Sequence, residues 1–140
     1  NKVITFKFLA EHIDARWPNL RNTCVQKDIR NKSEQVVFIS HGICRFFDIV
    51  MIPFSLKNHN RDAVFFGSID AVLGDNKEQT IVSDIDLIVN TKDPVLYNTA
   101  RDGFIFFVLK EAYKTQSRLN LIFKESGGRQ REIKLEGFSL

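Results

Sequence analysis

The sequence predicts an α+β fold, in which a mainly antiparallel sheet of about six strands carries two packed helices. The 140 residues are 44% hydrophobic and include 13 Phe, which suffices for one aromatic-rich core and a single domain spanning residues 1–140. Several short stretches alternate between apolar and polar residues, as half-buried strands do, and two others repeat at helical spacing. Short loops join the alternating stretches, which favours antiparallel pairing.

The first part of the chain is expected to hold one strand and a long loop. Residues 3–10 alternate, with Ile4, Phe6 and Phe8 on one face. Pro18 ends the regular pattern because proline has no backbone donor, and residues 21–32 are polar enough for a loop.

Residues 33–44 fit either a strand or a helix. The apolar run at 36–39 suits a strand, but a wider set falls at helical spacing: Val36, Ile39, Ile43 and Phe47. Ser33 is a suitable N-cap. We therefore expect a helix that ends near Gly42.

Two strands are expected next, at residues 46–56 and 62–73. The polar residues 57–61 form a plausible hairpin loop between them. Pro53 indicates that the first strand bends or lies at an edge, since proline cannot donate to a ladder.

Residues 79–90 show the clearest alternation. Ile81, Ser83, Ile85, Leu87 and Val89 face one way, and Asp84 and Asp86 face the other. Asp93 and Pro94 then signal a helix, an N-cap followed by proline at the first position. Gly103 would weaken this helix by roughly 1 kcal/mol. Its apolar stripe comprises Leu96, Ala100, Phe104, Phe107, Val108 and Ala112.

The chain is expected to close with a β-hairpin over residues 117–125 and 129–138. Gly127 and Gly128 supply the turn. The alternating pattern turns five residues inward: Leu119, Leu121, Phe123, Ile133 and Leu135.

The cysteines and histidines indicate neither a disulfide framework nor a metal site. Cys24 and Cys44 form no CxxC pair, and we expect two free thiols in a reducing compartment. His12, His41 and His59 have no metal-ligand spacing, so neither a metal nor another cofactor is expected.

No apolar run approaches the roughly 20 residues that span a bilayer, and no signal-peptide pattern is present. The chain starts at Asn1 and its one methionine is Met51. We therefore expect a native segment before Asn1.

One pattern is similar to the Gly-Ser … Asp-x-Asp signature of nucleotidyltransferases. Gly67-Ser68 precedes Asp84 and Asp86, and this resemblance implies triphosphate and Mg²⁺ binding. However, the spacing is longer than usual, Asn120 stands where a third carboxylate is expected, and the segment before Gly67 reads as a strand. The favoured explanation is the solvated face of a strand. A nucleotidyltransferase-fold domain, active or inactive, is the alternative.

Other catalytic signatures are absent from the sequence. It contains no GxSxG, P-loop, HExxH or GxGxxG pattern. Glu132-Ile133-Lys134 has the form of a nuclease ExK triplet, which is common on exposed strands. No catalytic residue is therefore assigned.

Charge is distributed unevenly. Residues 61–90 carry two Lys/Arg against six acids (net −4), and residues 91–140 carry nine against six (net +3). Basic residues gather towards the C-terminus and are predicted to bind anionic partners, with Arg129 and Arg131 exposed together: Lys110, Lys114, Arg118, Arg129 and Arg131. A solvated face, with acids interspersed, is the plainer interpretation. Trp17 and Leu20 either plug the core or form an exposed apolar contact.

The order of these predicted elements resembles the globular core of a rhabdovirus matrix protein. The likeness covers a Phe-rich opening strand at 3–10, a Val-rich helix at 33–44, three strands, a helix after Asp93-Pro94 and the terminal hairpin. It concerns order and pattern rather than a diagnostic motif.

This resemblance implies a non-enzymatic structural protein of the virion. Such a protein would self-associate, bind the viral nucleocapsid and an anionic membrane surface, and act in assembly and budding in the cytoplasm or nucleus of an infected cell. Membrane contact would come mainly from a basic N-terminal tail. This chain has neither a Lys-rich tail nor a proline-rich budding motif, which a segment before Asn1 would explain. A basic β-rich nucleic-acid binder is a third possibility.

Overall fold

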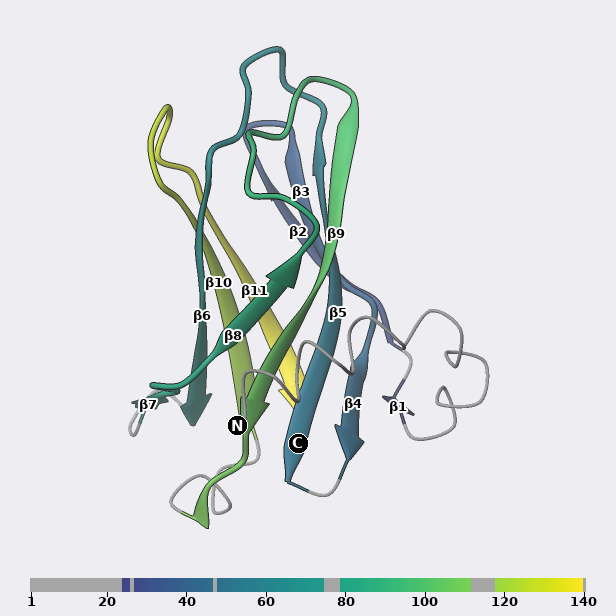
Figure 1. Ribbon diagram of the computed structural model, residues 1–140, viewed down its shortest axis with the longest axis vertical. Coiled ribbons are helices and arrows are strands. Elements are labelled where there is room, and N and C mark those ends of the chain that lie inside the picture. Colours follow the sequence, from purple (N-terminus) through teal and green to yellow (C-terminus); the bar gives the residue numbers. More distant parts are fainter. Residues whose placement is uncertain (1–23, 26, 47, 75–78, 112–117, 140) are drawn as a thin grey trace.

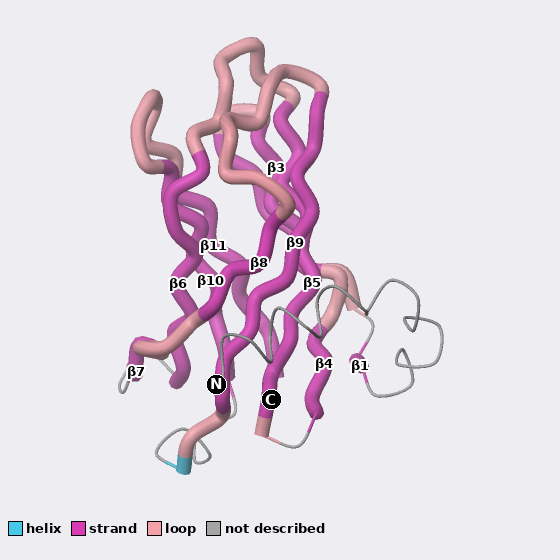
Figure 2. The backbone as a smooth tube through the Cα atoms, in the orientation of Figure 1, coloured by secondary structure: helices cyan, strands magenta, loops and turns pink. Residues whose placement is uncertain are grey.

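The computed structural model describes residues 24–25, 27–46, 48–74, 79–111 and 118–139. These residues form two antiparallel sheets that pack face to face as a sandwich, with long strands roughly along the long axis (Figures 1 and 2). The predictions for residues 3–10, Trp17, Leu20 and Lys114 lie outside the described residues.

One sheet has seven strands and the other has four. The larger sheet contains β1 (Cys24–Val25), β2 (Ile29–Ser33), β3 (Val36–Ser40), β4 (Ile43–Phe46), β5 (Ile49–Asn58), β8 (Asp86–Val89) and β9 (Thr99–Val108). The smaller sheet contains β6 (Phe66–Gly74), β7 (Gln79–Ile81), β10 (Arg118–Glu125) and β11 (Glu132–Ser139), in the order β11-β10-β6-β7.

β5 is the central strand of the larger sheet. It pairs with β9 over its whole length on one side, and with β4 and then β3 on the other. Pro53 lies where the partner changes from β4 to β3, and its carbonyl accepts a hydrogen bond from the backbone N–H of His41. The N–H and C=O of one strand residue point to the same side of the strand. The N–H that proline lacks would therefore have pointed to the gap between β4 and β3, where no ladder hydrogen bond is lost. Of the two expectations for Pro53, a bend or an edge, the edge was therefore wrong.

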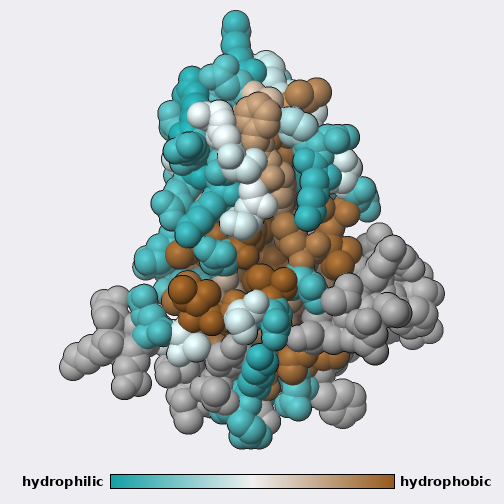
Figure 3. All heavy atoms as spheres, turned by 60° about the vertical axis from the view of Figure 1, so that its left-hand side comes forward, coloured by the Kyte–Doolittle hydropathy of each residue, from teal (hydrophilic) through white to brown (hydrophobic). Residues whose placement is uncertain are grey.

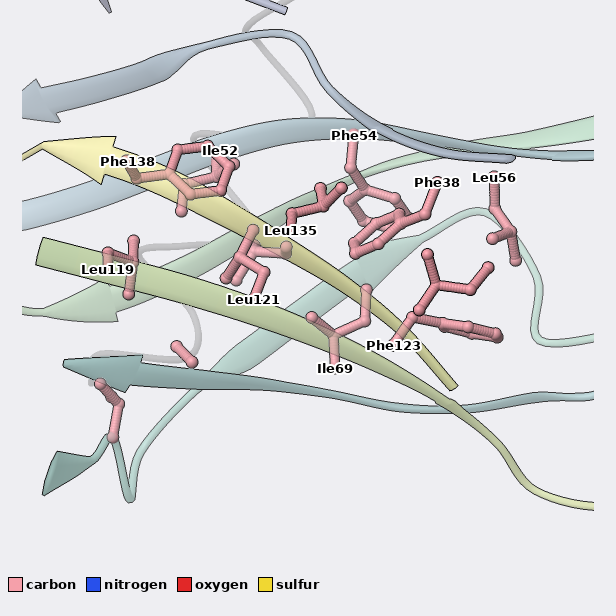
Figure 4. Close-up of a cluster of buried hydrophobic side chains, with 14 of the residues drawn as sticks. Phe38, Ile52, Phe54, Leu56, Ile69, Leu119, Leu121, Phe123, Leu135 and Phe138 are labelled. Carbon is pink, nitrogen blue, oxygen red and sulfur yellow. The ribbon is translucent and has the colours of Figure 1, made fainter. Parts of the chain in front are cut away.

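The core lies between the two sheets and is rich in phenylalanine. Phe38 and Phe54 from the larger sheet meet Phe66 and Phe123 from the smaller one, with ring centroids 5.5–6.2 Å apart. Figure 4 shows the rings of Phe38, Phe54 and Phe123 among side chains from both sheets, including Ile52, Leu56, Ile69, Leu119, Leu121, Leu135 and Phe138. Such tilted and edge-to-face ring contacts add about 0.5–1.5 kcal/mol per pair beyond burial.

A second apolar cluster lies on the other face of the larger sheet. Its buried members are Cys44, Met51 and Phe106, and Ile88 and Phe104 pack against them. Cys24 stands directly opposite Cys44 in the β1–β4 ladder, and the two form a disulfide. The expectation of two free thiols was wrong, because the antiparallel pairing of β1 and β4 places the two cysteines opposite each other.

The α+β prediction was wrong, because no α-helix occurs among the described residues. The segment expected to be the first helix contains β3 and part of β4, and the second expected helix is β9. In both segments, apolar side chains point to the core from one face of the sheet and to the outer cluster from the other. The apolar–polar alternation typical of a strand is therefore lost, and the apolar residues fall at helical spacing by coincidence.

Two further predictions on the strands need correction. The stretches 46–56 and 62–73 do not form a hairpin, because β5 and β6 lie in different sheets. The stretch 79–90 is not one strand: β7 and β8 belong to opposite sheets, and residues 82–85 cross between them. Consequently Ile81 is 67% exposed rather than inward.

The terminal hairpin was predicted correctly. β10 and β11 pair antiparallel, and the five residues expected to face inward are buried: Leu119, Leu121, Phe123, Ile133 and Leu135.

Candidate functional site

Four connections meet at one end of the sandwich, which we call the loop end. They are the β2–β3 turn at residues 34–35, the β5–β6 loop at 59–65, the β8–β9 loop at 90–98 and the β10–β11 turn at 126–131. All lie at the top of Figure 1, the last of them in yellow at the upper left. Because loops on a rigid scaffold often carry binding residues, this end is a candidate site.

Buried amide side chains hold the loops together. The Asn58 side chain, fully buried, donates to the carbonyl oxygens of Asp62 and Val95 at 3.0 and 2.9 Å. Asn60 donates to the Glu34 carbonyl at 3.0 Å. Val64 and Val95 exchange both backbone hydrogen bonds, which joins the β5–β6 and β8–β9 loops. The loop end is therefore a connected surface.

Arg129 ties the terminal hairpin to two of the other connections. Its guanidinium lies 3.0 Å from a Glu34 carboxylate oxygen and 2.8 Å from one of Asp62. The hydrogen bonds that Arg129 donates raise its pKa, the bond to Asp62 more than the bond to Glu34. All three side chains are exposed, so this network orients the loops more than it stabilises the fold.

Arg131 lies inside the protein, in contrast to Arg129. Its Nη1 donates to both Glu125 carboxylate oxygens at 3.1 Å, and both side chains are fully buried. Glu125 also accepts hydrogen bonds from the backbone N–H groups of Phe65 and Arg131. The pair therefore clamps the start of β6 to the hairpin. Arg131 is unsuited to direct contact with an anionic partner.

Large apolar side chains are exposed at the loop end. Phe65 and Leu96 each follow a residue of the buried Val64–Val95 bridge, and Phe65, Leu96 and Tyr97 are 40%, 61% and 48% exposed. Lys57, Arg61 and Lys92 are exposed on the same connections or at their borders. Arg129 already engages Glu34 and Asp62, and Asp93 beside Lys92 is exposed, so this end combines apolar groups with a small excess of positive charge.

The structure separates the basic residues that the sequence grouped. Arg118 lies at the start of β10 and Arg129 beyond its end, so they are at least about 23 Å apart at 3.3 Å per strand residue. Lys110 pairs with Asp84 at 3.1 Å. Of the predicted residues that the structure describes, only Arg129 lies exposed at the loop end. Sequence reasoning missed Phe65, Leu96 and Tyr97, whose exposure depends on the neighbouring loops.

The residues of the nucleotidyltransferase-like pattern have separate structural roles. Gly67 is required because a Cβ there would collide with the Lys124 carbonyl oxygen on the adjacent strand. Gly67 and Ser68 lie on β6 in the smaller sheet, whereas Asp86 lies on β8 in the larger sheet. Asn120 faces a β-bulge of the terminal hairpin, between Leu119 and Leu121.

A polar chain on the larger sheet was not foreseen from the sequence. His41 Nε2 lies 2.7 Å from Ser55 Oγ, which donates to Asp102 at 2.5 Å, and His41 Nδ1 lies 3.6 Å from Asp28. Ser55 donates its one hydroxyl proton to Asp102, so His41 must be the donor in its hydrogen bond with the Ser55 oxygen. A general base would instead accept the serine proton. This series of hydrogen-bonded side chains thus attaches the β3–β4 corner to β5 and β9.

A groove of about 490 Å³ lies at the opposite end of the hairpin from the loop end. Arg118, Asn120, Lys134 and Glu136 are among its lining residues. Lys134 is 3.3 Å from Glu136, so part of its positive charge is compensated. The groove is open and polar.

Within the described ranges, no cluster of three His, Cys, Asp or Glu side chains could hold a metal ion. No helix in that part of the chain is long and apolar enough to cross a membrane. No protein-family model and no curated protein matches the sequence.

Proposed function

We propose that this chain is a non-enzymatic binding protein that attaches to anionic membrane surfaces through its loop end and associates with copies of itself. The observation that carries the membrane part is the exposure of Phe65, Leu96 and Tyr97 on joined loops, beside Lys57, Arg61 and Lys92. Apolar tips that enter the headgroup region and cations that face anionic lipid are the two parts of peripheral membrane binding.

This function agrees with the matrix role that the sequence resemblance implied, although the two helices in that resemblance are strands. The loop end replaces the predicted set of C-terminal cations as the contact. The nucleocapsid as a further partner and the virion as location stay predictions from the sequence.

The test compares binding to vesicles of phosphatidylserine and phosphatidylcholine. Replacing two of the three apolar side chains, Leu96→Ser with Tyr97→Ser, should weaken binding at least tenfold, since each buried side chain of this size is worth about 1.5–3 kcal/mol. Ile81→Ser is the matched control, because Ile81 is 67% exposed but lies on β7 outside the loop end.

The charge contribution is tested separately. Lys57→Glu and Lys92→Glu should each weaken the free energy of binding to phosphatidylserine vesicles by about 1 kcal/mol or more. Binding to pure phosphatidylcholine should change little. Equal binding by the tip variant, the Ile81 control and the unmodified protein would refute the proposal.

A further inference from the structure

We propose that two copies of this chain join through the free edges of β8, pairing antiparallel so that their seven-stranded sheets become one continuous sheet. This inference rests on the self-association part of the proposed function and names its surface. The contact is isologous, since each copy offers the same strand to the other.

Among the described strands, β8 has a partner on one side only. It pairs with β9, from Asp86 opposite Phe106 to Val89 opposite Gly103, and no other described strand lies along its second edge. The backbone donors and acceptors on that edge can be satisfied by water or by another strand. A regular open edge of this kind is a template for strand addition.

Three other edge strands, β2, β7 and β11, carry features that discourage strand addition, and a fourth, β1, has two residues. β2 and β11 lie beside each other, and the Asn31 side chain donates to the Lys134 carbonyl at 2.9 Å. β2 also carries Arg30 and Lys32. β7 has three residues. By contrast, the last three residues of β8 are Leu87, Ile88 and Val89, with no lysine, proline or glycine among them.

Apolar side chains flank this edge on both faces of the sheet. Leu87 and Val89 pack against the main core, and Ile88 packs against the outer cluster, yet all three are only partly buried. Figure 3 shows hydrophobic atoms across the middle of the side on which β8 lies, bordered by hydrophilic atoms above and at the left. A strand added here would cover apolar surface on both faces at once.

The residues of β8 also favour antiparallel pairing with a second copy. With Ile88 opposite its own copy, Leu87 of each chain would face Val89 of the other, and Asp86 would face the uncharged Asn90. A parallel arrangement would instead place the two Asp86 carboxylates together, which is destabilising.

The first experiment measures the dimer dissociation constant by sedimentation velocity. Ile88→Lys places two like charges opposite each other at the centre of the pairing and should raise the constant at least tenfold. Ile122→Lys is the matched control: Ile122 is also a partly buried strand isoleucine, but it lies on β10, which has neighbours on both sides. Its constant should match that of the unmodified chain.

Two substitutions at Asn90 cover the case in which Ile88→Lys unfolds. Asn90 is exposed and would face Asp86 of the other copy, so Asn90→Asp should weaken the dimer and Asn90→Lys should tighten it, each roughly twofold or more. Equal dissociation constants for all folded variants would overturn the β8 contact. Self-association would then have to use another surface. A strictly monomeric protein at millimolar concentration would remove self-association itself. The vesicle test with Leu96 and Tyr97 is independent of either result.

Discussion

Arg131 and Arg129 stand two residues apart but differ in what their replacement should do. Arg131→Met leaves the Glu125 carboxylate buried without its cationic partner, which should reduce the free energy of unfolding by about 3–5 kcal/mol. Arg129→Met removes two exposed ion pairs, with Glu34 and Asp62, and should change the free energy of unfolding far less. Equilibrium urea unfolding measures both.

A double variant separates burial of charge from packing in this pair. Glu125→Leu with Arg131→Met removes both charges and should recover much of the stability lost in Arg131→Met, because replacing a buried ion pair by apolar residues is often neutral. If Arg131→Met unfolds at the same urea concentration as Arg129→Met, the buried clamp is not a source of stability.

Gly103 gives a second contrast at the residue scale. A Cβ at this position would lie 2.7 Å from the Ile88 carbonyl oxygen and 2.8 Å from the Phe54 ring, so Gly103→Ala should destabilise by about 1–3 kcal/mol. Gly127→Ala is the control, since nothing lies within 4 Å of its added Cβ. Thermal melts should show a lower midpoint for Gly103→Ala alone.

The β2–β3 turn shows why some local structure escaped sequence analysis. Glu34 and Gln35 both have positive φ, at 48° and 66°, in a two-residue hairpin turn that favours Asn-Gly. Their carbonyl oxygens accept hydrogen bonds from the Asn60 side chain and the His59 backbone. Residues distant in the sequence thus support a turn whose own residues do not predict one. The same contacts between loops place Arg129 opposite Glu34.

At the scale of elements, the disulfide predicts a response to reductant. It closes a loop with a sequence separation of 20 residues, for which the chain-entropy model gives about 3 kcal/mol of stability. Purified protein should contain no free thiol, and adding reductant should lower the melting temperature. The Cys24→Ser/Cys44→Ser variant should melt near the reduced protein, with or without reductant. Two titratable thiols in the native protein would contradict the bond.

Strands were recognised from the sequence where one face is apolar and the other polar. The terminal hairpin meets that condition, since its inward residues alternate with Lys124, Glu132 and Lys134. β9 does not, because Ile105 and Phe107 face the core while Phe104 and Phe106 face the outer cluster. A strand that is apolar on both sides has no period of two, so its type could not be distinguished from a helix by pattern.

For the whole molecule, the pairing of distant strands predicts slow folding. β5 pairs with β9 and β6 pairs with β10, in each case across about 50 residues of chain. Refolding from urea, followed by stopped-flow fluorescence of the single Trp, should occur in milliseconds to seconds rather than microseconds. A microsecond phase with full amplitude would contradict a fold dominated by non-local pairing.

The place of β6 also has a consequence for synthesis on the ribosome. Ile69 pairs with Phe123, 54 positions later (123 minus 69). At 5–20 residues per second, roughly 3–10 s separate the emergence of the two residues. During that interval Ile69, Ala71 and Leu73 have no β10 beside them and no complete core to cover them. The nascent chain therefore passes through a stage that invites aggregation or chaperone capture, and slowing translation before residue 118 should lower the yield of folded protein.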